Sequence, residues 1–110
     1  MSLSPRRYLY EGLHLLLGIV IASAKEVERV LRYTRAAHQL GHEIKIFVTF
    51  EATKTLTQPI WEEIAAMATV IACAQTVHGY QVKVSSQIIL GSQFDHAEIA
   101  HEADRFLSFV

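Results

Sequence analysis

The chain has 110 residues, of which 51% are hydrophobic and 19% charged, and its formal net charge is −1. One domain accounts for this length, and the apolar balance excludes an intrinsically disordered chain. The sequence has ten basic and eleven acidic residues, and no basic run is longer than Arg6-Arg7. Since electrostatic binding to nucleic acid needs a positive stripe, we expect no nucleic-acid partner.

The beginning of the chain predicts a short arm followed by one domain. Residues 1–11 are the expected N-terminal arm, and residues 12–110 the expected domain. The apolar stretch Leu13–Ala24 is too short to cross a bilayer and contains His14. Glu11 and His14 separate the basic residues from the apolar run, which does not suit a signal peptide. We expect a soluble, cytoplasmic protein with no membrane partner.

The first predicted elements form a strand–helix–strand unit. Leu13–Ala22 has too many consecutive aliphatic residues to alternate, which is typical of a parallel strand buried on both faces. Ser23 as N-cap with Glu26 three residues later indicates a capping box, and Gly41 is the expected C-cap residue. Glu43–Phe50 is rich in β-branched and aromatic residues and predicts the second strand. The helix between them should turn an apolar stripe inward: Val27, Val30, Leu31, Thr34, Ala37 and Leu40.

The middle of the chain predicts a loop and then a helix. Glu51–Gln58 is polar and is expected to be a loop. Pro59 suits the first turn of a helix, and we interpret Trp61 as a packing or subunit-contact residue rather than a ligand platform. The residues expected on one face of this helix are Ile60, Ile64 and Met67.

Residues 69–72 (TVIA) allow two interpretations. They are a strand that ends at Cys73, or they continue the preceding helix, since Ile71, Ala74 and Val77 keep helical spacing. Three β-branched residues in a row favour the strand. Gly79 then ends the helical pattern.

The last third of the chain predicts two short strands around a helix. Gln87–Leu90 is the first strand and is ended by Gly91; Phe106–Val110 is the second. Asp95 as N-cap with Glu98 at N3 should open the helix between them. Its inward residues are expected to be Ile99, Ala100 and Ala103. The sequence thus predicts an α/β fold, a single-domain three-layer sandwich of about five mostly parallel strands flanked by helices.

Motifs for common cofactors and metals are missing from the sequence. Neither the dinucleotide-binding nor the phosphate-loop glycine pattern occurs, and no hydrolase nucleophile elbow is found. His38 and His42 straddle the expected helix end, and Glu98 and His101 have no evident third ligand. We therefore expect no cofactor and no metal.

Cys73 is the candidate catalytic residue. A single cysteine excludes an internal disulfide and a multi-cysteine metal site, and leaves an inert filler, an intermolecular bridge or a reactive thiol. If residues 69–72 are a strand, Cys73 ends it, at the sheet edge where ligands collect. The helix that follows would lower the pKa of the thiol. His78, five residues later, is the candidate supporting residue.

The ordered set of segments resembles the DsrE/DsrF/YchN-like family of small α/β sulfur-relay proteins. The residues that carry the resemblance are the first apolar strand, AAHQLGHE with IKIF (36–47), VIAC (70–73), Gly79, AEIA (97–100) and EADRFLSF (102–109). Active members of the family hold sulfur as a persulfide on a cysteine after the third strand and pass it to a partner, and Cys73 matches that position. The resemblance also implies homotrimers, hexamers or mixed complexes. Other members lack the cysteine and serve as structural partners.

Three functions are therefore open at the level of sequence. The first is a sulfur carrier or sulfurtransferase subunit that relays persulfide sulfur through Cys73, with sulfur-donor and sulfur-acceptor proteins as partners and a homo-oligomeric (trimeric or hexameric) state. The second is a non-catalytic assembly or regulatory subunit in which Cys73 is buried and unreactive. The third is a small-molecule-binding domain that uses the same sheet edge.

Overall fold

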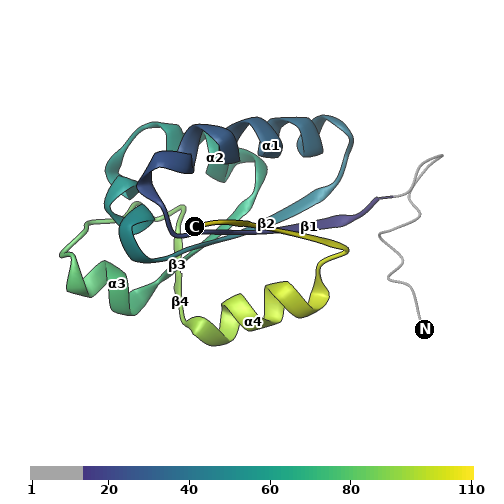
Figure 1. Ribbon diagram of the computed structural model, residues 1–110. Helices are drawn as coiled ribbons and strands as arrows, with labels where there is room; N and C mark the ends of the chain where they lie inside the picture. The colour runs from purple at the N-terminus through teal and green to yellow at the C-terminus, as the bar shows by residue number, and fades with distance from the viewer. Residues whose placement is uncertain (1–13) are drawn as a thin grey trace.

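The computed structural model describes residues 14–110, which form one five-stranded sheet with helices on both faces (Figure 1). The predicted arm, residues 1–11, and the first two residues of the predicted domain lie outside the described residues. The strand order is β4-β3-β2-β1-β5, and every neighbouring pair is parallel. The predicted α/β class is therefore confirmed.

The elements alternate between strand and helix along the chain. The strands are β1 (Leu16–Ile21), β2 (Glu43–Val48), β3 (Thr69–Cys73), β4 (Ile89–Gly91) and β5 (Arg105–Phe109). The α-helices are α1 (Val27–Gln39), α2 (Ile60–Met67), α3 (Ala74–Gly79) and α4 (Gln93–Glu102). Two 3₁₀ segments precede α1 and α2, namely η2 (Ala24–Glu26) and η3 (Phe50–Thr57).

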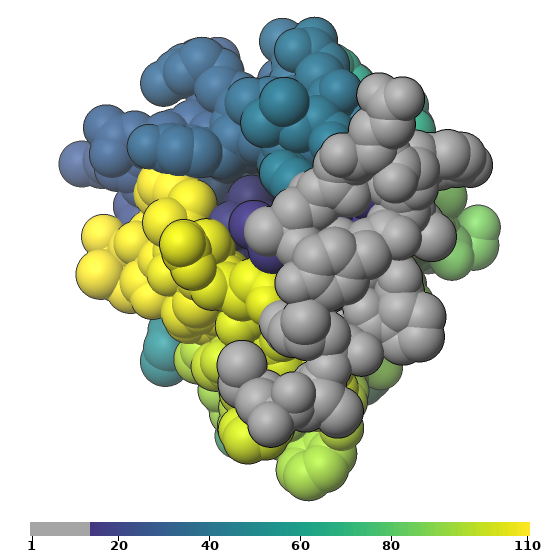
Figure 2. Space-filling view, turned by 90° about the vertical axis from the view of Figure 1, so that its right-hand side faces the viewer, coloured from purple at the N-terminus to yellow at the C-terminus, as the bar shows by residue number. Residues whose placement is uncertain are grey.

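The helices divide unequally between the two faces of the sheet. Helices α1 and α2 lie together on one face, and α4 lies on the other (Figure 1). The perpendicular view shows the same separation, with the blue residues of α1 above and the yellow-green residues of α4 below (Figure 2). Because successive side chains of a strand point to opposite faces, each central strand contributes to two cores.

The two cores differ greatly in size. Among residues 14–110, the core under α1 and α2, called the large core below, contains eighteen buried residues, including Ile19, Ile21, Ile46 and Trp61. The core under α4, called the small core, contains four: Val20, Phe47, Cys73 and Ile99. Both faces of β1 are thus buried, as its continuous aliphatic run predicts.

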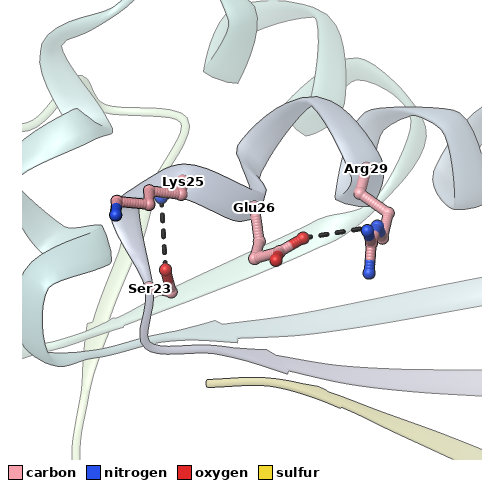
Figure 3. Close-up of polar contacts among 4 residues, drawn as sticks. All are labelled: Ser23, Lys25, Glu26 and Arg29. Atoms are coloured by element: carbon pink, nitrogen blue, oxygen red, sulfur yellow. Dashed lines mark hydrogen bonds and ion pairs between the residues drawn. The ribbon is translucent and has the colours of Figure 1, made fainter.

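The start of α1 differs in detail from the prediction. The Ser23 side chain accepts a hydrogen bond from the Lys25 backbone N–H at 3.2 Å, so Ser23 caps η2, and α1 follows directly. The Glu26 side chain does not complete a capping box but pairs with Arg29 at 3.3 Å (Figure 3). The 3₁₀ turn brings the Glu26 carboxylate next to Arg29, and this ion pair takes the place of the predicted capping box with Ser23.

The inward stripe of α1 is confirmed except at its end. Five of the six predicted residues are buried, but Leu40 is 70% exposed. The helix ends at Gln39, and Gly41 with φ +81° adopts the left-handed conformation expected of a residue after a helix. Leu40 therefore lies in the turn, where the helical spacing no longer sets its direction.

The predicted loop at residues 51–58 is wrong. Residues 50–57 form η3, in which Ala52, Thr53, Thr55 and Leu56 are buried. The Thr55 hydroxyl donates to the Ala52 carbonyl at 2.6 Å and accepts from Trp61 Nε1 at 2.9 Å. These local bonds satisfy the polar groups, so a polar segment is buried. Trp61 is itself buried, which confirms its interpretation as a packing residue.

The second half of the chain settles the strand alternative and corrects a helix start. Residues 69–73 form β3, and α3 begins immediately after Cys73. Helix α4 begins two residues before the predicted Asp95: Ser92 is the N-cap, and Asp95 at N3 completes a capping box with it. The prediction of Asp95 as N-cap is therefore wrong, and Ala100 is exposed rather than inward.

The first strand starts at Leu16, three residues after the predicted start, which lies outside the described residues; the other strand boundaries fall within two residues of the predicted ones. Within the described part of the chain, no helix is both long and apolar enough to span a bilayer.

Candidate functional site

Cys73 occupies the position that its sequence pattern predicts, at the carboxyl end of a central strand. It is the last residue of β3, pairs in register with Gly91 of β4, and is the N-cap residue of α3. Its side chain lies on the α4 side of the sheet with Phe47 and Ile99, and the residue is only 3% exposed. The fold thus places a single thiol where a parallel sheet collects ligands.

A pocket of about 490 Å³ opens beside this thiol. Three segments form its walls: the residues that follow β2, helix α3 with the residue after it, and the first residue of α4. Its lining residues are Thr49, Phe50, Cys73, Gln75, Thr76, Gly79, Tyr80 and Gln93. None of these described lining residues is charged, so the sulfur is surrounded by hydrogen-bond donors rather than by cations.

The pKa of the Cys73 thiol lies below its ordinary value. Burial raises the pKa, but hydrogen bonds to the sulfur outweigh this effect. They come from the backbone and hydroxyl groups of Thr76 and from the backbone of Gln75. The Thr49 hydroxyl, which has no hydrogen-bond partner among the described residues, can also donate to the thiolate and lowers the pKa further. The backbone donors exist because α3 begins directly after Cys73 and leaves its first N–H groups without helical partners. The site therefore favours the thiolate, which is the nucleophilic form of cysteine.

Threonines hold the first turn of α3 against η3. The Thr76 hydroxyl donates to the Cys73 carbonyl at 3.0 Å and is joined to the Thr53 hydroxyl at 2.8 Å. Once Cys73 is ionised, the Thr76 hydroxyl can rotate toward the sulfur, because a hydroxyl hydrogen has no fixed direction. The strand end, the helix start and η3 are thus connected at the thiol.

The outer wall of the pocket is aromatic. Phe50 is 61% exposed and has φ +47°, a left-handed conformation that is uncommon for a bulky residue. Tyr80 is fixed by Glu51, which accepts from its hydroxyl at 2.9 Å, and by Lys54, which lies 4.6 Å from the centre of its ring. The hydrogen bond from Lys54 lowers the pKa of Glu51. The pocket is therefore lined by exposed aromatic rings on its outer side and by polar groups next to the thiol.

His78, the supporting residue expected from sequence, is exposed near the end of α3 and does not line the pocket. The structure places Gln93 there instead, with Nε2 3.9 Å from Cys73 Sγ. Gln93 Oε1 in turn contacts His96 Nδ1 at 3.1 Å.

Sequence reasoning missed Thr49, Gln93 and His96, but two signals were available. Thr49 directly follows β2 as Cys73 ends β3, so the rule that sheet edges collect ligands applies to both. The correct N-cap, Ser92, would have placed Gln93 at the first position of α4, beside the edge.

The two pairs considered for metal binding, His38 with His42 and Glu98 with His101, lie in different parts of the fold. His38 is exposed, whereas His42 is half-buried and accepts a hydrogen bond from the Leu15 N–H at 3.1 Å. Glu98 and His101 are both exposed on α4. Among residues 14–110, no three side chains of the His, Cys, Asp or Glu type come together as a metal site would require.

The fold and the site together describe an α/β protein with a single thiol of lowered pKa. This thiol lies at the sheet edge, beside a pocket whose lining residues carry no charge. No protein-family model and no curated protein matches the chain. Chemically, the arrangement suits nucleophilic attack by the Cys73 thiolate on an electrophile small enough to enter the pocket.

Proposed function

We propose that the protein is a sulfur carrier, a sulfurtransferase subunit that relays persulfide sulfur through Cys73 to a partner protein. The observation that carries the proposal is the lowered pKa of a nearly buried thiol beside a pocket. Burial protects a bound sulfur atom from solvent, and the lowered pKa provides both a nucleophile and a good leaving group. The resemblance to the DsrE/DsrF/YchN-like proteins supports the same function.

The transfer is balanced without a cofactor. The Cys73 thiolate attacks the outer sulfur of a donor persulfide, a new S–S bond forms, the old one breaks, and the donor leaves as a thiolate. An acceptor thiolate then attacks the outer sulfur on Cys73, takes it as its own persulfide and releases the Cys73 thiolate. Neither step needs an external oxidant or reductant.

The test is to incubate the protein with a persulfide donor and measure its intact mass. We expect the wild type to gain the mass of one sulfur atom and to lose it when a thiol acceptor is added. Because the chain has one cysteine, Cys73→Ser is expected to gain nothing. A wild type that stays unchanged, or a Cys73→Ser protein that gains the same mass, contradicts the proposal.

The second candidate is a non-catalytic assembly or regulatory subunit, favoured by the 3% exposure of Cys73. Buried thiols usually act as small hydrophobic groups. Labelling with a small alkylating agent separates the two functions. A sulfur carrier reacts in the native state, whereas an inert filler reacts only after denaturation.

We also infer a homo-oligomer, with a trimer or hexamer as the expected size, and a cytoplasmic location. The edge strand β4 leaves Ile89 and Leu90 exposed, and Phe94 beside it is exposed as well. Exposed apolar groups on an open sheet edge favour association. A reducing compartment would keep Cys73 as a thiol. Light scattering at micromolar concentration is the test, and a stable monomer contradicts the oligomer.

A further inference from the structure

Thr49 carries a buried hydroxyl that has no hydrogen-bond partner among the described residues. It is 3% exposed and lines the pocket beside Cys73. A buried polar group without a partner destabilises the fold, so its presence calls for an explanation. Its place beside Cys73 indicates that its partner is an anionic sulfur, either the Cys73 thiolate or a sulfur atom bound to it.

Gln93 supplies a second donor. Its Oε1 lies 3.1 Å from His96 Nδ1, and this contact is a hydrogen bond when His96 carries its proton on Nδ1. The amide N–H groups of Gln93 must then point the other way, toward Cys73 Sγ at 3.9 Å. That distance is long for a direct contact and leaves the amide able to serve an atom attached to the sulfur.

The His96 ring is held by two aromatic neighbours. It stacks on Phe47 with ring centres 5.2 Å apart and on Phe106 at 6.0 Å. The first turn of α4 is fixed by the capping box between Ser92 and Asp95. His96 therefore has little freedom to move away from Gln93.

Thr49 and Gln93 approach Cys73 from the two neighbouring strands. Thr49 follows β2 and Gln93 follows β4 after one residue, while Cys73 ends β3 between them. A persulfide adds one sulfur atom beyond Cys73 Sγ, and this outer sulfur is more acidic than a thiol and is readily anionic. Since the pocket lining carries no cation, hydrogen bonds must stabilise that charge.

We propose that the Thr49 hydroxyl and the Gln93 side-chain amide bind the anionic outer sulfur of a Cys73 persulfide, and that His96 is a positioning residue that directs the Gln93 amide. This inference rests on the proposed sulfur-carrier function and adds a binding site for the transferred atom. It also assigns an acceptor to the unpaired hydroxyl of Thr49.

The experiment loads the protein with sodium polysulfide and titrates the persulfide by the ultraviolet absorbance of its anion. Removing either donor should make the persulfide less acidic. We expect its acid dissociation constant to fall about tenfold in Thr49→Val and in Gln93→Met, because hydrogen bonds to a charged group are among the strong ones. Thr49→Ser keeps the hydroxyl and should titrate like the wild type, which separates loss of the hydroxyl from a change in packing.

The positioning role of His96 is tested in a double-mutant cycle. His96→Phe keeps an aromatic ring between Phe47 and Phe106 but removes the N–H, and should lower the acid dissociation constant about threefold. In the Gln93→Met background the same change should have no further effect, because His96 acts through Gln93. His101→Phe on the same helix is the control for the substitution itself, and Thr34→Val is the control for loss of a buried, unpaired hydroxyl.

The outcomes separate this inference from the proposed function. If the wild type takes up no sulfur on Cys73, both fall together. If it takes up sulfur but Thr49→Val and Gln93→Met titrate like the two controls, the sulfur-carrier function stands and the outer-sulfur site is overturned. If His96→Phe has the same effect with and without Gln93, the positioning role is overturned and the two donors remain.

Discussion

The two faces of the sheet differ in how much apolar surface they bury and in where the candidate site lies. Within the described part of the chain, the large core under α1 and α2 contains eighteen buried residues, whereas the small core under α4 contains four, one of which is Cys73. Helix α1 buries five residues, and α4, which is fully described, buries Ile99 alone. The strands between them are the same, so the difference arises from how the two sets of helices cover them.

This contrast places stability on one face and chemistry on the other. Hydrophobic stabilisation grows with the apolar area removed from water, so most of it belongs to the large core. The thiol, Gln93 and His96 lie on the thinly covered face. Substitutions on the two faces should therefore change different observables.

The largest effect is expected in the large core, at Trp61. Trp61→Ala removes a fully buried ring and its hydrogen bond to Thr55, and should lower the free energy of unfolding by about 3–5 kcal/mol. Urea unfolding measures it. Ile99→Ala in the small core should cost less, and an equal loss from the two substitutions would break the comparison.

The next effect concerns the close approach of β4 and α4. A β-carbon at Gly91 would lie 2.6 Å from Ile71 Cγ2 and 2.5 Å from Asp95 Oδ2. Gly91→Ala should therefore destabilise the protein by about 1–3 kcal/mol through overpacking, and should displace Gln93 from Cys73. Thermal unfolding and the alkylation rate of Cys73 report the two consequences.

Gly79→Ala is the matched control, because a β-carbon there meets nothing within 4 Å. The change should raise the free energy of unfolding by about 0.4–1 kcal/mol, because alanine lowers the conformational entropy of the unfolded chain. Loss of stability at both glycines would contradict the proposed role of close packing at Gly91.

Thr49 should show stability and function changing in opposite directions. Thr49→Val replaces an unpaired buried hydroxyl by a methyl group and should stabilise the fold by about 1 kcal/mol. The same change should raise the pKa of the Cys73 thiol, since the Thr49 hydroxyl lowers it. Chemical denaturation and the pH profile of alkylation are the measurements. Thr34→Val should reproduce the gain in stability without the change in pKa.

The smallest effect is a pH dependence of stability. The pKa of Cys73 is lower in the folded protein than the ordinary value of 9.0, so the unfolded chain binds more protons between the two values. The ionised thiol therefore makes its full contribution to the free energy of unfolding above about pH 9. This contribution is lost as the pH falls through the pKa of Cys73 in the folded protein. The stability difference between wild type and Cys73→Ala should thus grow as the pH rises through this window. A difference that is constant with pH contradicts the lowered pKa.

Local patterns predicted the elements better than they predicted the site. The aliphatic run of β1, the stripe of α1 and the placement of Cys73 at a strand end depend on neighbours in sequence, and the structure bears them out. Burial of the 50–57 segment depends on side-chain hydrogen bonds that composition does not reveal. The pocket unites residues from three separate segments, so only the tertiary fold brings Thr49 and Gln93 to Cys73.

The pairing of the last strand with the first has a consequence for how the chain is made. β5 lies beside β1, and the Leu16 N–H donates to Asp104 Oδ2 across 88 positions of sequence. Contacts this distant close large loops and form late in folding. During synthesis, β1 to β3 with α1 and α2 can associate early, while one flank of β1 stays open until β5 emerges. The face of the sheet that carries Cys73 is thus covered later than the opposite face.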